Sequence, residues 1–435
     1  MNSEINLFNV FFKYGLAIFP LLLLTGPLIP ELFLILVIFF SCFYIIKEKR
    51  YKFFKNKYFV FFIFFYFSVL ISTIINFYNF DLSIGGITYF RIPLFAFSIW
   101  FILEKFKFYD KKIVLFYSVF LTFIIFDSLF QYYSGKNLLG YEVKYARISS
   151  FFGDELILGG FILRTLPIFL IYLVMNEMLS EKKQSIYILI LISLACFVIY
   201  ISGERTSFGL LILFFFTLFF ISKFLRKFVI LVAIISLALS IILPNLITSE
   251  EVHPGTRMFK KTYNQFLGIG EEQHEEHKKK LGNKVYIFSH DHHGHYVLSY
   301  RMFKDHKVFG TGVKGFRYLC GNKIYILEKN DGCSTHPHNT YVQILVSNGL
   351  IGFSLLIFAL FFIIREIFVC KRKMNLQNEF EKYEVSKVIA ISAIFINIWP
   401  LVPSGSFFNN WLSMFYFYPI GFYLYFKLRN EKETN

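Results

Sequence analysis

The sequence predicts an all-α integral membrane protein with about twelve transmembrane helices and one large loop outside the membrane. Hydrophobic residues make up 56% of the 435 residues and charged residues only 17%, whereas a typical soluble domain is about 45–50% apolar and about 25% charged. The apolar residues also gather in runs of about 20, the length that a helix needs to cross a bilayer. A soluble globular protein is therefore excluded.

Apolar runs bounded by charged or turn residues define the predicted helices. They cover residues 8–24, 28–46, 58–76, 85–103, 113–131, 156–175, 185–201, 205–222, 228–246, 341–364, 387–403 and 408–426. The first run lacks a small-residue cleavage site, so we interpret it as a retained helix and not a signal peptide. The runs predict three parts: membrane helices over 1–246, a large loop over 247–340, and further membrane helices with a cytoplasmic tail over 341–435.

Lysine and arginine are unevenly divided between the short connections. One set of alternate connections, which includes 47–57 and 365–387, carries 24 of them, and the other set, which includes 132–155, carries 4. The positive-inside rule therefore places the first set and both termini in the cytoplasm, and the large loop outside. Most of the net charge of +16 is explained by this topology, so no nucleic-acid partner is implied.

Histidine is confined to the large outer loop. The ten histidines are His253, His274, His277, His290, His292, His293, His295, His306, His336 and His338. The apolar runs hold almost no acids, since Asp127, Glu31 and Glu155 lie near their ends. Ion-coupled transporters generally place carboxylates at mid-depth. The pattern therefore disfavours a coupled transporter and locates the chemistry in the outer loop.

The end of the loop carries the main candidate for catalysis. His338 follows Pro337 and stands directly before the tenth apolar run, at the membrane surface. A neutral imidazole there is suited to remove a proton from a sugar hydroxyl. The alternative is a solvated histidine near a helix N-terminus. Gly349 and Gly352, about one helical turn apart, are expected to permit close helix packing near this site.

Arg205 begins the eighth apolar run at its outer end. The free N–H groups and the positive dipole end of a helix N-terminus favour a phosphate group. The planar guanidinium binds phosphate through two parallel hydrogen bonds. The alternative is an arginine that extends to the lipid headgroups.

Two further outer segments carry arginine. Arg147 precedes the sixth apolar run, whose helix Asp154 or Glu155 is expected to cap. Arg301 lies on a predicted short helix and is a candidate for pyrophosphate binding, although loop solubility explains it equally well. The Gly-x-Gly-x-x-Gly run that starts at Gly310 imitates a dinucleotide-binding motif. It lacks the preceding strand of a βαβ unit, so we reject that interpretation.

The run from His290 to His295 has the composition of a metal site, but its side chains are too crowded for one tetrahedral ion. No second cysteine or carboxylate pair completes it, so we predict no metal, and the role of the run stays open. Of the five cysteines, Cys320 and Cys333 share the outer loop. An oxidising compartment favours a disulfide between them.

One motif carries a family resemblance. His338 and Asn339 are followed by nine residues and then by Gly349-x-x-Gly352. With Arg205 at the outer turn of a twelve-span chain, this resembles the O-antigen ligase and O-antigen polymerase superfamily. The family pattern is His followed by Asn, Ser or Gln, then nine residues and Gly-x-x-Gly, at the end of a large periplasmic loop.

Two other segments resemble the family with departures. The segment from Arg301 to Gly312 resembles the family's loop helix and Gly-x-Gly turn, but Lys307 stands where the family has proline. The segment 147–160 resembles another family segment, with Asp-Glu-Leu at 154–156 where the family has Asp-Pro-Asn. The resemblance therefore supports His338 and Arg205 more firmly than the other arginines.

The resemblance implies a GT-C-like enzyme of the bacterial inner membrane that needs no metal or cofactor and inverts the sugar linkage. Its donor would be a polyprenyl-pyrophosphate-linked glycan. Its acceptor, at the periplasmic face and among membrane lipids, would be the lipid A core for a ligase or a second lipid-linked glycan for a polymerase. The implied roles are His338 as base, Arg205, Arg301 and Arg147 as pyrophosphate ligands, and Asn339, His336, Gly349 and Gly352 as supporting residues.

The motif spacing favours a ligase. A polymerase is the alternative, and a polysaccharide exporter or flippase is the alternative of another class.

Overall fold

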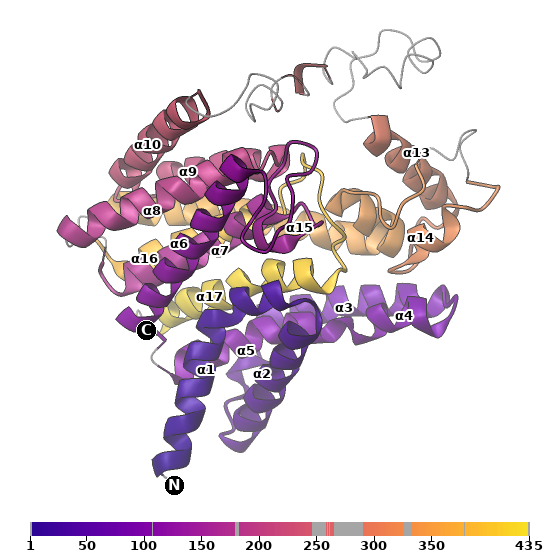
Figure 1. Cartoon of the computed structure of the whole chain (residues 1–435). Coiled ribbons are helices and arrows are strands. Elements are labelled where there is room, and N and C mark those ends of the chain that lie inside the picture. The colour runs from indigo at the N-terminus through magenta and orange to yellow at the C-terminus, as the bar shows by residue number, and fades with distance from the viewer. Residues whose placement is uncertain are drawn as a thin grey trace.

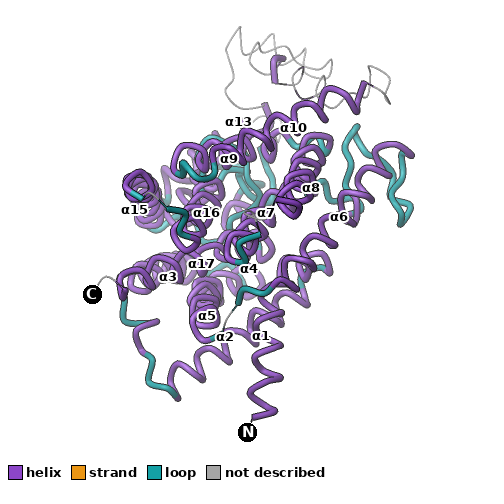
Figure 2. Tube along the Cα trace, turned by 90° about the vertical axis from the view of Figure 1, so that its left-hand side faces the viewer, coloured by secondary structure: helices purple, strands orange, loops and turns teal. Residues whose placement is uncertain are grey.

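A computed structural model describes residues 2–106, 108–178, 182–245, 258, 260, 262–264, 290–325, 332–377 and 379–433. In these residues the regular structure is helical, as Figure 1 and Figure 2 show, with two isolated β-bridges between residues 136 and 147. The α-helices are α1 (Asn2–Leu22), α2 (Leu28–Lys47), α3 (Lys57–Ile75), α4 (Phe80–Ile87), α5 (Arg91–Lys105), α6 (Lys111–Ser134), α7 (Leu158–Met175), α8 (Lys182–Ile201), α9 (Arg205–Ile221), α10 (Arg226–Asn245), α13 (His290–Asp305), α14 (Gly315–Leu319), α15 (Thr340–Leu376), α16 (Lys382–Asn397) and α17 (Asn410–Glu433). The short 3-10 helices are η1 (Leu23–Thr25), η2 (Tyr51–Phe53), η3 (Thr88–Phe90) and η4 (Ser150–Phe152).

Each apolar run predicted from the sequence overlaps a helix, but the run 85–103 is divided among α4, η3 and α5, and α16 ends before the run 387–403 does. Among the described residues, 8 helical segments are long and apolar enough to cross a membrane, and two shorter apolar helices cover Val10–Thr25 and Arg205–Ile221. The described part of the chain is therefore helical and has the composition of an integral membrane protein. The number of twelve spans, the GT-C-like arrangement, the orientation and the extent of the large loop stay predictions.

Burial distinguishes central from peripheral helices. The apolar window of α7 is 94% buried inside the protein, whereas that of α10 is 17% buried. Accordingly, α7 contacts α6, α8, α9 and α16, while α10 leaves most of its apolar surface for lipid. The helices α5 and α17 also pack closely, because a Cβ atom at Gly421 would lie only 2.5 Å from the Cβ of Ile99.

Polar residues of the connections fix where several helices begin and end. The side chain of Asn56 accepts hydrogen bonds from the first free N–H groups of α3, and Asp110 does the same for α6. Gly135 ends α6 in the left-handed conformation, with φ of 79°. Such caps satisfy backbone groups that a helix terminus leaves free.

Buried charges join the ends of α15, α16 and α17. Glu366 of α15 pairs with Lys427 of α17 at 3.1 Å, and Glu384 of α16 pairs with Lys373 of α15 at 2.8 Å. The sequence analysis placed residues 365–387 in a connection, but α15 and α16 both extend into it. These carboxylates are therefore helix residues, and their ion pairs attach neighbouring helices to one another.

The helix α15 is broken at Gly349, where φ is 64° and ψ is −161°. The break leaves backbone groups of α15 without helical partners, and the loop before α14 supplies them. The bonds run from Thr311 N to Val346 O (2.8 Å), from Gly312 N to Ser347 O (2.9 Å) and from Leu350 N to Lys307 O (2.8 Å). We call this pairing of residues 307–312 with 346–350 the seam.

Gly349 serves the seam, whereas the spacing of the two motif glycines predicted close packing between helices. A Cβ atom at Gly349 would lie 2.2 Å from the carbonyl oxygen of Val308, and one at Gly310 would lie 2.4 Å from the backbone of α15. A Cβ atom at Gly352 would meet the side chain of Asn348 at 2.3 Å. The sequence spacing indicated a close approach, but the partner is the backbone of the loop.

The end of α3 holds the seam from the other side. The hydroxyl of Ser72 donates to the carbonyl of Ser347 (2.5 Å), and the amide of Asn76 donates to the carbonyl of Gly310 (2.9 Å). The hydroxyl of Tyr78 reaches the carbonyl of Thr311 (3.0 Å). Figure 1 shows the result, with α14 beside α4 and the start of α15. The outer segment is thus attached to α15 by backbone hydrogen bonds and to the end of α3 by side-chain hydrogen bonds.

We predict that Gly349→Ala destabilises the protein by at least about 2 kcal/mol, because alanine is strained at positive φ and its Cβ would overlap a carbonyl oxygen. Thermal unfolding of the purified protein in detergent measures the change. Gly209→Ala in α9 is the control, because a Cβ atom there meets open space. Equal unfolding temperatures for the two variants would contradict the role given to the seam.

Candidate functional site

The backbone fixes the position of His338. Its φ is 53°, an uncommon value for a residue with a side chain, and its carbonyl accepts a hydrogen bond from Ser404 N at 2.8 Å. The next residue, Asn339, caps α15 by accepting from its first two free N–H groups at 2.9 and 3.1 Å. The imidazole therefore lies at the start of α15 on a backbone held from both sides.

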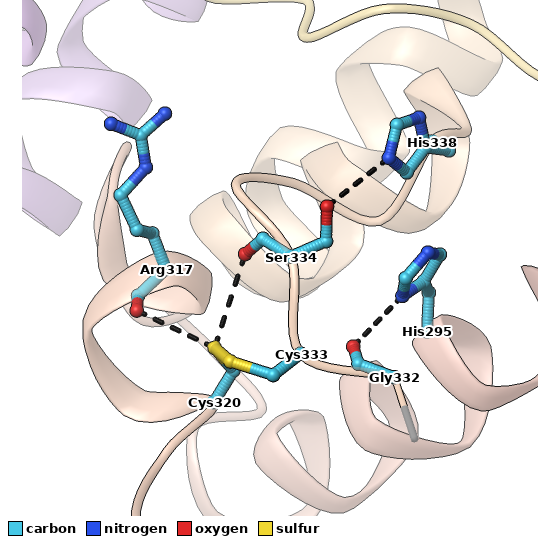
Figure 3. The surroundings of a disulfide bond; sticks show 7 residues. All are labelled: His295, Arg317, Cys320, Gly332, Cys333, Ser334 and His338. Atoms are coloured by element: carbon cyan, nitrogen blue, oxygen red, sulfur yellow. Dashed lines mark hydrogen bonds between the residues drawn. A yellow bond between two sulfur atoms is a disulfide. The ribbon is translucent and has the colours of Figure 1, made fainter. Parts of the chain in front are cut away.

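A disulfide holds the segment that leads to His338. Cys320 at the end of α14 is joined to Cys333, with the two Cα atoms 5.1 Å apart. The next residue, Ser334, places its hydroxyl 3.2 Å from Nε2 of His338. We call residues 332–338 the strap. Figure 3 shows the disulfide, Ser334 and the imidazole of His338 along it.

Four imidazoles gather at this point, and we call His292, His295, His336 and His338 the histidine cluster. The ring centre of His338 lies 4.0 Å from that of His336, 5.1 Å from that of His295 and 5.7 Å from that of His292. Two members come from α13 and two from the strap before α15. The sequence run from His290 to His295 thus contributes two of its rings to the candidate site.

The surroundings lower the pKa values of His336 and His338. Burial, followed by the charges of the other three imidazoles, lowers the pKa of His338 from 6.5 to about 3. Burial also lowers the pKa of His336, to about 4. A hydrogen bond with the Ser404 backbone acts in the opposite direction and raises this pKa, but burial has the larger effect. A histidine that is neutral well below pH 6 is available as a proton acceptor over the whole physiological range.

The described residues contain no group of three or more His, Cys, Asp or Glu side chains placed to hold a metal ion. In the histidine cluster, Nδ1 of His295 instead contacts the carbonyl of Gly332 at 2.8 Å, so this nitrogen carries the proton. His253, His274 and His277 lie outside the described residues.

A second polar cluster forms around Glu204, in the turn between α8 and α9. Its carboxylate accepts hydrogen bonds from Gly159 N (2.7 Å), Gly160 N (3.0 Å) and the hydroxyl of Ser207 (2.7 Å). Glu204 therefore caps α7 from another loop, where Asp154 or Glu155 was expected to cap it. Neither does so, because the residue at the cap position is Ile157 and it offers no side-chain acceptor.

Two of the three predicted arginines belong to this second cluster. Arg147 donates to the carbonyl of Leu156 (2.8 Å) and lies 3.8 Å from the Glu204 carboxylate. Arg205 follows Glu204 as the exposed first residue of α9, close enough for the charge of Arg147 to act on it. Burial lowers the pKa of Arg147 and raises the pKa of Glu204, so their pairing is less favourable than in a fully solvated ion pair. We call these two arginines and Glu204, together with Arg164 of α7, the arginine cluster.

Arg164 is the member that the sequence analysis missed. It lies one turn inside α7, donates to the carbonyl of Gly160 (3.0 Å) and stands over the ring of Tyr416. Its Nε is buried without a hydrogen-bond partner among the residues that the structure describes. A cation inside an apolar run is itself a signal of function, and Arg164 lies within the sixth run.

Arg301 is placed differently from the other two predicted arginines. It lies on α13 six residues after His295, is exposed, and donates to the carbonyl of Tyr325 (3.3 Å). Its contribution to anion binding stays a prediction.

The loop between α16 and α17 supports the catalytic segment. The amide of Asn339 donates to the carbonyl of Pro400 (2.9 Å), and the amide of Gln343 donates to the hydroxyl of Ser406 (2.9 Å). The same loop leads into α17, whose Tyr416 lies under Arg164. The loop therefore connects the supports of both clusters, although its sequence holds no charged residue to indicate this.

Comparison with known proteins finds a partial match. Residues 189–357 match the family model described as O-antigen ligase, and no curated protein matches the chain. The matched segment runs from α8 to the middle of α15, so it contains Arg205, Arg301, His338 and both motif glycines. Through this segment the chain is similar to the O-antigen ligase family, and the match supports the resemblance to the O-antigen ligase and polymerase superfamily.

Proposed function

We propose that the chain is an O-antigen ligase-type glycosyltransferase. It moves a glycan from a polyprenyl-pyrophosphate donor to a sugar hydroxyl of the lipid A core at the periplasmic face of the inner membrane. The observation that carries the proposal is the imidazole of His338, which is fixed at the start of α15 and has a pKa lowered to about 3.

His338 is the general base of the proposed reaction. The acceptor oxygen forms a bond to the anomeric carbon of the donor sugar, and the bond from that carbon to the pyrophosphate oxygen breaks. The hydroxyl proton passes to the imidazole, and the pyrophosphate leaves with the bonding electrons. A single displacement of this kind inverts the configuration at the anomeric carbon and uses no metal or cofactor.

The arginine cluster is the proposed site for the leaving group. Arg147 and Arg205 bring two guanidinium groups to the N-termini of α7 and α9, where N–H groups also favour an anion. Charge that develops on the departing pyrophosphate is stabilised by such preorganised donors. Arg301 on α13 is proposed as a third cation on the side of the histidine cluster.

An anionic donor also changes the base. Negative charge near His338 favours the imidazolium and raises its pKa from the low value of the empty site. The base is therefore strengthened by the substrate that it must act on. This resolves the apparent conflict between a pKa of about 3 and a role as proton acceptor.

We predict that His338→Ala abolishes transfer while the protein remains in the membrane, because no base then accepts the hydroxyl proton. Glycan ladders of a deletion strain carrying the variant measure this, with His293→Ala, an exposed residue of α13, as the control. A normal ladder at matched expression would exclude the proposed role.

In the same strain without the gene, loss of all attached glycan supports a ligase. One retained repeat supports a polymerase, and lipid-linked glycan trapped on the cytoplasmic side supports an exporter or flippase.

The low pKa of His338 predicts weak pH dependence on the acid side. An imidazole with the usual pKa of about 6.5 would be about 90% protonated at pH 5.5, and kcat/KM would fall about tenfold from its value at pH 7.5. With a pKa of about 3 the base stays neutral at both values, so we expect kcat/KM to change less than about twofold. Steady-state assays with purified protein and lipid-linked donor test this, and a tenfold fall would show that the imidazole is ordinary.

Arg205→Lys separates pyrophosphate binding from simple anchoring at the headgroups. Lysine keeps the charge but not the two parallel hydrogen bonds, so we expect activity to fall at least about tenfold, or about 1.4 kcal/mol of transition-state stabilisation. Initial rates with purified protein provide the measurement. Unchanged activity in the lysine variant would assign Arg205 to the membrane surface instead.

A further inference from the structure

Two histidines of α13 lie against the proposed base without being needed to accept the substrate's proton. His292 and His295 are three residues apart and occupy one face of α13. Their ring centres lie 5.7 and 5.1 Å from that of His338. His293 lies between them in sequence and is exposed, so only part of the histidine-rich run is turned toward the site.

We propose that His292 and His295 are positioning residues that keep His338 free of a proton in acidic surroundings, so that the enzyme retains its base there. The inference rests on the proposed function, in which His338 is that base. It assigns a role to a run of histidines whose composition suggests a metal site but whose crowding disfavours one.

The orientation of His295 is fixed by the strap that also carries the base. Its Nδ1 donates to the carbonyl of Gly332 at 2.8 Å, and the next residue, Cys333, is bonded to Cys320. Figure 3 shows the rings of His295 and His338 on the same side of this strap. The distance between the two rings is therefore set by covalent and hydrogen-bonded structure, and not by a flexible surface contact.

Proximity makes protons compete within the histidine cluster. A positive charge on one imidazole disfavours a proton on a ring beside it. The described side chains whose charges act on His338 are His336, His295 and His292, and all of them disfavour its proton.

The other groups around the cluster give little support to a proton on His338. Arg317 of α14 adds a positive charge that disfavours a proton on His336. The loop before α17 contributes the backbone of Ser404, which favours a proton on His336 and not on His338. On its own strap, Ser334 offers a hydroxyl that bonds either form of the ring.

The test removes the titrating rings but keeps their polar contacts. In His295→Asn the side-chain amide still donates to Gly332, and His292→Gln keeps a polar side chain on the same face. Diethyl pyrocarbonate reacts only with a neutral imidazole, so mass spectrometry of the modified His338 peptide across pH 3–8 reports its protonation in the full-length protein. We expect the midpoint for His338 to rise by about one pH unit in the double variant, and the acid limit of transfer activity to rise with it.

His293→Gln is the matched control and should leave the midpoint unchanged. An unchanged midpoint in the double variant would overturn the inference. If the double variant does not fold, as judged by gel filtration, His292→Gln alone decides, because it leaves the bond between His295 and Gly332 in place. Its midpoint must rise for the inference to stand.

The two proposals fail in different ways. If His338→Ala keeps full activity, His338 is not the base and the proposed function is wrong. If His338→Ala is inactive while the midpoint stays unchanged in the histidine variants, only the role of His292 and His295 is wrong.

Discussion

The seam between the broken helix α15 and the loop before α14 is the constraint on which the candidate site depends. It needs a residue without a side chain at Gly349, because the carbonyl of Val308 occupies the space of a Cβ atom. The hydrogen bonds that cross it tie the outer segment to α15 at the end of the helix that begins beside His338. Side-chain hydrogen bonds from Ser72 and Asn76 at the end of α3 hold the same seam. Backbone geometry, more than side-chain packing, therefore sets where the base lies.

The two polar clusters have opposite electrostatic designs. In the histidine cluster, burial and the neighbouring imidazoles lower the pKa values of His336 and His338. In the arginine cluster, one partly buried carboxylate is shared by helix N–H groups, a hydroxyl and a guanidinium. Glu204 therefore orders cations that would otherwise repel one another, at the ends of two helices that favour anions. A neutral base and a positive anion site are the two features that the proposed transfer requires.

Much of the fold could be predicted from the sequence, because apolar runs of spanning length report helices directly. The disulfide partners were also predictable, since Cys320 and Cys333 are the two cysteines of the outer loop. The break in α15 was not, because a glycine pair one turn apart looks the same whether its neighbour is a helix or a loop backbone. Glu204 was missed as the cap of α7 because its partners are 44 and 45 residues away in the chain. Caps were sought only in the residues next to the helix.

The histidine-rich run shows why spacing alone could not assign a role. Residues 290 to 295 offered several ligands to a metal, and on a helix only those three or four apart share a face. That face was unknown until α13 was placed against the strap. With His292 and His295 turned toward His338, the role proposed for them follows from distance and burial. The spacing of the run could supply neither quantity, because both depend on how the strap folds against α13.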